Sequence, residues 1–345
     1  MKLLIIKLGA LGDVLRTTPL LTAFKKKDPL GSITWVADPA NVDVLKGNPY
    51  IDRLMDSSAA TSEWLQTQHF DLAVCLDKEP EATALLSVSN STKKMGFARD
   101  KAGVLCAADP LSDYALRLGV DDDLKFRRNQ KSYQEISFEQ LGMSFDGEEY
   151  VFSVDEASAT AARNYLKKIG VGPHSLARPV VGLNTGSGTR FAGKKLPMET
   201  YARLAEEFHE KMKGTVFLLG GDEEIKRNET IQKMAVCPTV NTGSHPIRVF
   251  AAFVKMCDLV VTGDTTAMHV AIAVKTPVVA YFASTCAQEI EMYGRGRKIV
   301  SGISCAPCYK KICPIDEQCM KDMGIAQIFR EAKHLLGQDH AASIS

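Results

Sequence analysis

The stretch KLGALGDVL, residues 7 to 15, follows the apolar run of residues 3 to 6 and decides how the chain begins to fold. A short buried strand that runs into two glycines and then into a helix is typical of the first βα unit of a parallel sheet. Asp13 stands at the head of that helix. It either caps the helix by accepting backbone N–H bonds or projects towards a ligand as a general base. The spacing of Gly9 and Gly12 does not match G-x-G-x-x-G, which disfavours a dinucleotide site.

Strand-like and helix-like patterns alternate along both halves of the chain. Runs such as SITWVAD and DLAVCLD are followed by helical patterns, and a second series extends from PVVGLNTGSG to PVVAYFAS. This alternation predicts an α/β fold with two Rossmann-like domains built on parallel sheets. We expect domains at residues 1–172 and 173–335, a linker within 172–179 and a tail at 336–345. Because ligands bind beyond the carboxyl ends of parallel strands, the two sheets are expected to face each other across one cleft.

Composition indicates a soluble globular protein. Of the 345 residues, 45% are hydrophobic and 24% charged, and the formal net charge is only +1, so no global field attracts nucleic acid. The apolar run at the start is too short for a signal peptide, and no other run approaches a membrane span. We therefore expect a cytoplasmic protein. Three small basic clusters are either solvated faces or contacts for a membrane or an anionic substrate, and they lie at residues 25–27, 125–128 and 310–311.

A glycine-containing loop, NTGSGTRFAGKKLP at residues 184–197, follows the first strand of the second half. Its N–H groups can face oxyanions, and it includes Thr185, Gly186 and Lys194. The loop is not a Walker A sequence, because no Ser or Thr follows Lys194. Its lysines are either solvated or directed at an anion.

Two further strand-to-helix junctions carry acids and free amides. FLLGGDEE ends in Glu223 and Glu224, which suit a sugar hydroxyl but are also common at helix starts. TGDTTAMHVA, residues 262 to 271, offers free amides at a helix start that could bind a phosphate. Its residues of interest are Asp264, Thr265, Thr266, Ala267, Met268 and His269.

These ordered motifs resemble those of glycosyltransferase family 9, the bacterial heptosyltransferases that build the lipopolysaccharide inner core. GALGDVLRTTPLL resembles the family's GD-V/I-x-x-T-x-P opening, and KKLP resembles its K-x-aromatic-P element. GGDEE resembles its nucleotide-side acidic loop, and GDTTAMHVAIAVKTPVVAYF resembles its D-T/S-G-x-x-H-x-A-x-A-x-x-x-P segment. The chain departs from the pattern at Leu196, which replaces an aromatic residue, at Thr266, which replaces a glycine, and at residues 283–285, which replace glycine-proline-threonine.

The resemblance implies a GT-B architecture with an acceptor-binding first domain and a nucleotide-sugar-binding second domain. It implies an inverting, metal-independent transfer of heptose from ADP-L-glycero-D-manno-heptose to a lipopolysaccharide inner-core acceptor, in peripheral contact with the cytoplasmic face of the inner membrane. Asp13 is then the catalytic base, with Gly9 and Gly12 on the acceptor side. The implied donor-binding residues are Lys194, Thr185, Gly186, Glu223, Glu224, Asp264, Thr265, Thr266, Ala267, Met268 and His269. The acidic run at residues 121–123 is expected to be an exposed loop rather than a catalytic metal site.

Other functions remain open on the sequence alone. A family member could use another nucleotide sugar or another acceptor. The chain could be a non-catalytic nucleotide-sugar-binding module, and a nucleotide-sugar epimerase would share the two-domain architecture while converting its donor with no acceptor present.

Four cysteines crowd into the segment CAPCYKKICPIDEQCM, at Cys305, Cys308, Cys313 and Cys319. Their spacing suits a tetrahedral zinc ion or, less well, an iron–sulfur cluster. Reduced thiols and redox-dependent disulfides are the alternatives. The resemblance suggests a structural rather than a catalytic role, and no cofactor is expected to be required for the reaction.

Overall fold

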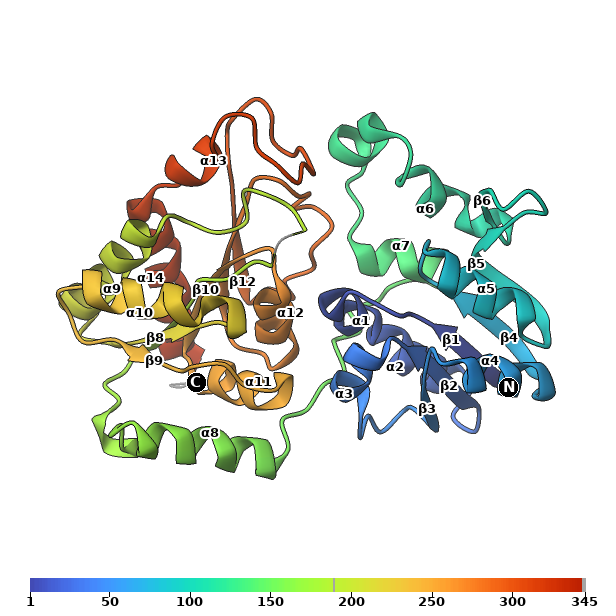
Figure 1. The fold of residues 1–345 in the computed structure, drawn as a ribbon, viewed down its shortest axis with the longest axis horizontal. Helices are drawn as coiled ribbons and strands as arrows, with labels where there is room; N and C mark the ends of the chain where they lie inside the picture. Colours follow the sequence, from blue (N-terminus) through green and yellow to red (C-terminus); the bar gives the residue numbers. More distant parts are fainter. Residues whose placement is uncertain (189, 343–345) are drawn as a thin grey trace. The chain divides into compact units, whose positions relative to one another are not determined.

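The computed structural model describes residues 1–188 and 190–342 and divides the chain into two compact units, each an α/β fold (Figure 1). The first unit comprises Met1–Phe152 together with Gln288–Glu291, and the second unit comprises the remaining residues from Ser153 on. The predicted α/β class with two Rossmann-like domains is confirmed.

The first unit is built on a six-stranded sheet in the order β3-β2-β1-β4-β5-β6. Its strands are β1 (Lys2–Ile6), β2 (Ser32–Ala37), β3 (Arg53–Asp56), β4 (Phe70–Cys75), β5 (Ser91–Arg99) and β6 (Leu105–Ala107). Neighbours are parallel except β5 and β6. Leu3 to Ile6 are buried, as expected for a central parallel strand covered on both faces. The helices are α1 (Leu11–Thr17), α2 (Pro19–Lys27), α3 (Val42–Leu45), α4 (Ala59–Thr67), α5 (Pro80–Val88), α6 (Asp113–Arg117) and α7 (Tyr133–Glu139), with a π-helical turn, η3 (Leu124–Arg128).

Two helices, α1 and α2, follow β1 where the sequence pattern suggested one. Pro19 begins α2 at its first position, where the missing N–H costs nothing. The Thr18 hydroxyl donates to the Leu15 carbonyl at 2.6 Å. The N-cap of α1 is Ala10, and Asp13 lies inside the first turn. Interpreting Asp13 as the N-cap is therefore wrong.

The second unit has an all-parallel sheet in the order β12-β11-β10-β7-β8-β9. Its strands are β7 (Val180–Asn184), β8 (Thr215–Leu219), β9 (Val240–Asn241), β10 (Leu259–Gly263), β11 (Val278–Phe282) and β12 (Gly296–Val300). Its helices are α8 (Glu156–Lys168), α9 (Met198–Met212), α10 (Ile225–Met234), α11 (Ile247–Met256), α12 (Thr266–Ala273), α13 (Gln318–Lys321) and α14 (Ile325–Ala342).

The limits of the units differ from the expected domain limits. The first unit ends at Phe152 rather than at residue 172, because α8 packs against α11. The Tyr165 ring of α8 meets Phe253 of α11 edge-on, with 5.9 Å between centroids. At the other end, α14 continues to Ala342 through most of the predicted tail, and residues 343–345 lie outside the described residues.

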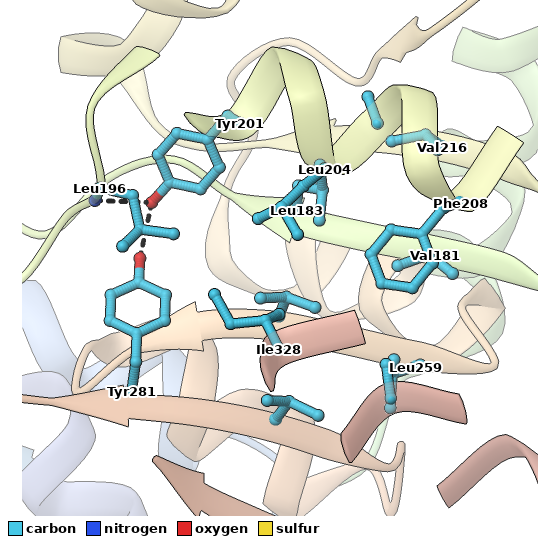
Figure 2. Close-up of a cluster of buried hydrophobic side chains, with 14 of the residues drawn as sticks. Val181, Leu183, Leu196, Tyr201, Leu204, Phe208, Val216, Leu259, Tyr281 and Ile328 are labelled. Carbon is cyan, nitrogen blue, oxygen red and sulfur yellow. Dashed lines mark hydrogen bonds between the residues drawn. The ribbon is translucent and has the colours of Figure 1, made fainter. Parts of the chain in front are cut away.

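A pair of buried tyrosines joins the two ends of the loop after β7 through hydrogen bonds. The hydroxyls of Tyr201 and Tyr281 are 2.6 Å apart, and the Leu196 N–H donates to Tyr201 at 3.4 Å (Figure 2). Tyr201 in turn donates to the Asn184 carbonyl at 3.0 Å. Since Asn184 and Leu196 lie near the two ends of the loop, the hydroxyl of one side chain holds both ends.

Candidate active site

Both sheets reverse their strand order beside the first strand, between β1 and β4 in one unit and between β7 and β10 in the other. Ligands of open α/β sheets bind beyond the carboxyl ends of the strands at such points. The predicted site residues follow β1, β7, β8 and β10, so each set lies at the expected edge of its own sheet.

In the first unit, Asp13 is held by a neighbour on its own helix. Its carboxylate pairs with the Arg16 guanidinium at 2.7 Å, and the Asp13 side chain stays 28% exposed. Arg16 also lies over the Tyr133 ring, 3.9 Å from its centroid. This ion pair holds the carboxylate in place while its side chain stays partly exposed.

A buried ion pair between Lys7 and Asp77 supports the turn before Asp13. Asp77 accepts from the Leu8 N–H at 2.6 Å and the Gly9 N–H at 3.2 Å, and Lys7 donates to the Gly9 carbonyl at 3.0 Å. Burial would lower the pKa of Lys7, but attraction by the charges around it, including Asp77, raises that pKa above its usual range. Gly9 also lies close to Asn41, whose Nδ2 would be 3.0 Å from an added Cβ.

This pair was missed in the sequence. Its signal was a lysine and an aspartate at the carboxyl ends of two apolar strand runs, β1 and β4. Gly12, the other residue expected on the acceptor side, is buried as the second residue of α1.

In the second unit, a cavity of about 310 Å³ lies at the ends of β7, β8 and β10. The predicted donor residues that line it are Gly186, Glu224, Thr265, Thr266 and Ala267. Glu224 is buried and accepts from the Gly221 N–H at 2.9 Å. A Cβ on Gly186 would lie 2.3 Å from the Glu224 carboxyl carbon, so a glycine is needed there. Gly186 after β7 and Gly220 after β8 thus make room for the Glu224 side chain.

The cavity also has an apolar wall that the sequence motifs did not indicate, made by His245, Ile247 and Phe250. The His245 Nε2 lies 2.6 Å from the Thr242 carbonyl, and its ring packs edge-on against Tyr165 at 4.6 Å between centroids. A cavity lined by both a wall of this kind and a carboxylate suits a nucleoside, whose base is apolar on its faces and whose ribose carries hydroxyls.

A charge cluster adjoins the cavity. Lys194 and Asp264 form an ion pair at 3.1 Å with both side chains about 15% exposed, and the His269 Nε2 is 3.9 Å from Asp264. Burial would raise the pKa of Asp264, but the attraction of Lys194 and His269 holds it below its usual range. The loop rests on Gly263, where an added Cβ would lie 2.1 Å from the Lys194 carbonyl. Lys194 is thus held next to the start of α12.

The remaining predicted donor residues lie away from the cavity lining. The Met268 N–H bonds to the Thr265 carbonyl within α12, and the Met268 side chain is fully buried. Thr185 is buried and bonds to Asn228 and the Leu219 carbonyl. Glu223 is exposed. Of the three amides expected to bind a phosphate, those of Thr266 and Ala267 belong to residues that line the cavity.

Asn184 is a further residue that sequence reasoning missed. Its side-chain nitrogen donates to the Gly186 carbonyl at 2.8 Å and to the Thr262 hydroxyl at 3.1 Å. It therefore ties the loop after β7 to the end of β10. An asparagine at the end of an apolar strand was the available signal.

The cysteine-rich segment packs on the Lys194 loop. The Ala192 N–H donates to the Lys310 carbonyl at 3.0 Å, and the Tyr309 N–H donates to the Ser284 carbonyl at 2.8 Å. Burial and the nearness of the other three thiols raise the pKa of Cys319 to about 11. The four cysteines are free thiols. Within the described ranges, no group of three or more His, Cys, Asp or Glu side chains is arranged to hold a metal ion, and a structural zinc site at these cysteines stays a prediction.

Several surface charges are paired. Arg128 contacts Asp121 at 3.1 Å and Asp123 at 2.8 Å, and Lys25 contacts Asp52 at 3.1 Å. Across the described part of the chain, no helix is long and apolar enough to cross a bilayer.

Comparison with known proteins shows the family to which the chain belongs. The model of glycosyltransferase family 9 (heptosyltransferase) matches residues 59–318, and the chain belongs to that family. Over 174 residues the chain is 28% identical to lipooligosaccharide heptosyltransferase 2 of Campylobacter jejuni. This matched stretch covers 47% of this chain and 53% of that relative. The chain thus spans about half the length of the curated relatives it matches.

Two solved structures share the fold across nearly the whole chain. A glycosyl transferase family 9 protein of Veillonella parvula is 19% identical with a TM-score of 0.75, covering 98% of this chain and 97% of that one. The ADP-heptose lipopolysaccharide heptosyltransferase II of E. coli is 17% identical with a TM-score of 0.72, covering 99% and 100%. These similarities confirm the GT-B type of α/β fold.

Proposed function

We propose that the chain is an inverting glycosyltransferase that transfers heptose from ADP-L-glycero-D-manno-heptose to a lipopolysaccharide inner-core acceptor. The observation that carries the proposal is the cavity of the second unit, with an apolar wall, a buried carboxylate at Glu224 and a helix start beside Lys194. These groups suit the base, ribose and diphosphate of a nucleotide sugar. Family membership and the similarity to named heptosyltransferases support heptose as the sugar.

In the proposed reaction, the Asp13 carboxylate takes the proton of an acceptor hydroxyl. The acceptor oxygen forms a bond to the anomeric carbon while the bond from that carbon to the diphosphate oxygen breaks, and ADP leaves with the electron pair. Arg16 orients the Asp13 carboxylate through their ion pair. Lys194 and the amides of Thr266 and Ala267 stabilise the charge that develops on the diphosphate.

The reaction as proposed needs no cofactor. The protein is proposed to act in the cytoplasm, in peripheral contact with the inner membrane. We also propose a structural zinc site at Cys305, Cys308, Cys313 and Cys319, with reduced thiols and redox-dependent disulfides as the alternatives. Elemental analysis of protein purified without chelators tests it, because one zinc per chain would support the site and no metal would overturn it.

The test of the proposed function is a transfer assay followed by mass spectrometry. The acceptors are lipid A carrying 3-deoxy-D-manno-octulosonic acid (Kdo) and its mono-heptosylated form, and the donors are ADP-heptose and a panel of other nucleotide sugars. A mass gain of one heptose from ADP-heptose alone supports the proposal. Transfer of another sugar would show that the donor is a different nucleotide sugar. Conversion of the donor with no acceptor present would identify an epimerase, and nucleotide binding with no turnover would identify a binding module.

A further inference from the structure

A second cavity, of about 200 Å³, lies within the first unit beside Arg16. It is formed by α1, the loop after β4, α7 and the π-helical turn η3. Its polar lining includes Arg16, Lys78, Lys125, Gln140, Glu79 and Glu289.

Lys78 is a half-buried cation whose charge is incompletely compensated. Its ammonium group donates to the Ala115 carbonyl at 3.1 Å and lies 4.9 Å from the centroid of the Phe97 ring. Burial, followed by repulsion from Lys125, lowers its pKa to about 8. The carboxylates that face it, Glu289 and Glu79, act in the opposite direction but do not offset this, and Lys7 adds to the repulsion.

A second lining residue has a donor without an acceptor. Gln140 is 3% exposed, and its Nε2 has no hydrogen-bond partner among the described residues. The same holds for the Nε of Arg16, whose terminal nitrogen pairs with Asp13. A buried polar group left unpaired costs free energy, so a ligand that brings acceptor oxygens would be favoured here.

We propose that this cavity binds an oxyanion of the acceptor substrate, a carboxylate or a phosphate ester, through Lys78 and Gln140. The identity of the ligand as the acceptor rests on the proposed function. Arg16 lines the cavity and also holds Asp13, so an acceptor anchored here by its anionic group would have a hydroxyl positioned near the base. The anionic group of the acceptor is then a determinant of specificity.

Two probes distinguish the sources of the oxyanion. Kdo presents a carboxylate, and sulfate stands in for a phosphate ester while keeping its charge between pH 7 and pH 9. Binding of each probe to the full chain is followed by NMR, without donor. The variants are Lys78→Gln and Lys78→Arg, with Lys94→Gln as the matched control, because Lys94 is also half-buried and donates to a carbonyl, that of Ser87 at 2.7 Å.

We expect wild-type affinity for at least one probe to fall severalfold between pH 7 and pH 9, since the protonated fraction of a group with a pKa of about 8 falls from about nine-tenths to about one-tenth. Lys78→Gln weakens binding at least tenfold at pH 7, Lys78→Arg binds with little dependence on pH, and Lys94→Gln behaves as wild type. Preference for Kdo identifies a carboxylate, and preference for sulfate identifies a phosphate ester.

No binding of either probe, or affinity unchanged in a folded Lys78→Gln protein, would overturn the proposal. Because these measurements need no turnover, a protein that binds a probe through Lys78 but transfers no heptose would refute the proposed heptose transfer and leave the oxyanion site intact.

Discussion

Replacing Lys194 by methionine separates the two roles we assign to this lysine. The Lys194–Asp264 pair spans 3.1 Å and is largely buried, and at an effective dielectric constant of ~20 its attraction is about 5 kcal/mol. Residual exposure and the nearby His269 reduce the loss, so we expect Lys194→Met to lower the free energy of unfolding by about 3 kcal/mol. Thermal unfolding should shift down by roughly 6–12 °C.

The same variant should bind ADP about tenfold to a hundredfold more weakly, because a charge-assisted hydrogen bond to a phosphate contributes ~1.5–3 kcal/mol. The control is the double variant Lys194→Met/Asp264→Asn, which removes the carboxylate that the first change leaves unpaired. It should recover most of the stability but none of the ADP affinity. Calorimetry measures both quantities, and unchanged ADP affinity in Lys194→Met would refute the donor role.

Two further changes address the second unit. Glu224→Gln should weaken ADP binding roughly fivefold to tenfold through a lost ribose contact. The affinity for inorganic diphosphate, measured in competition experiments, should stay unchanged. Equal losses of affinity for both ligands would contradict a ribose contact at Glu224. Tyr201→Phe should lower the free energy of unfolding by about 2 kcal/mol, because it removes the contacts to Asn184 and Leu196 and leaves the buried Tyr281 hydroxyl unpaired. Tyr281→Phe should lower the free energy of unfolding by less in the Tyr201→Phe variant than in the wild type. Strictly additive losses of this free energy in denaturant unfolding would argue against a coupled pair.

Strand and helix alternation was sufficient to predict the fold class and most elements of both sheets. The limits of the units were not predictable from local pattern, since α8 is an amphipathic helix whose place is decided by the contact of Tyr165 with Phe253 across a long stretch of sequence. The same reason hid the pairing of Tyr201 with Tyr281, which lie eighty positions apart.

The site was predictable where glycines and acids directly follow strands, as at Gly186, Glu224 and Thr265. It was not predictable where an ordinary residue gains its role from burial. Lys78 follows β4 like many surface lysines, and only the surrounding cavity gives it an unusual environment. His245 likewise carries no motif, and its role in the apolar wall depends on the fold.

The central claim is that the Asp13 carboxylate is the base of a transfer whose donor binds in the second unit. Its most direct test is the turnover number of Asp13→Asn for transfer of heptose from ADP-heptose to Kdo-lipid A, measured beside the equilibrium affinity for ADP. The account predicts a turnover number about 10²–10⁴-fold lower with ADP affinity unchanged. Turnover within threefold of wild type, in a variant that binds ADP normally, would contradict it.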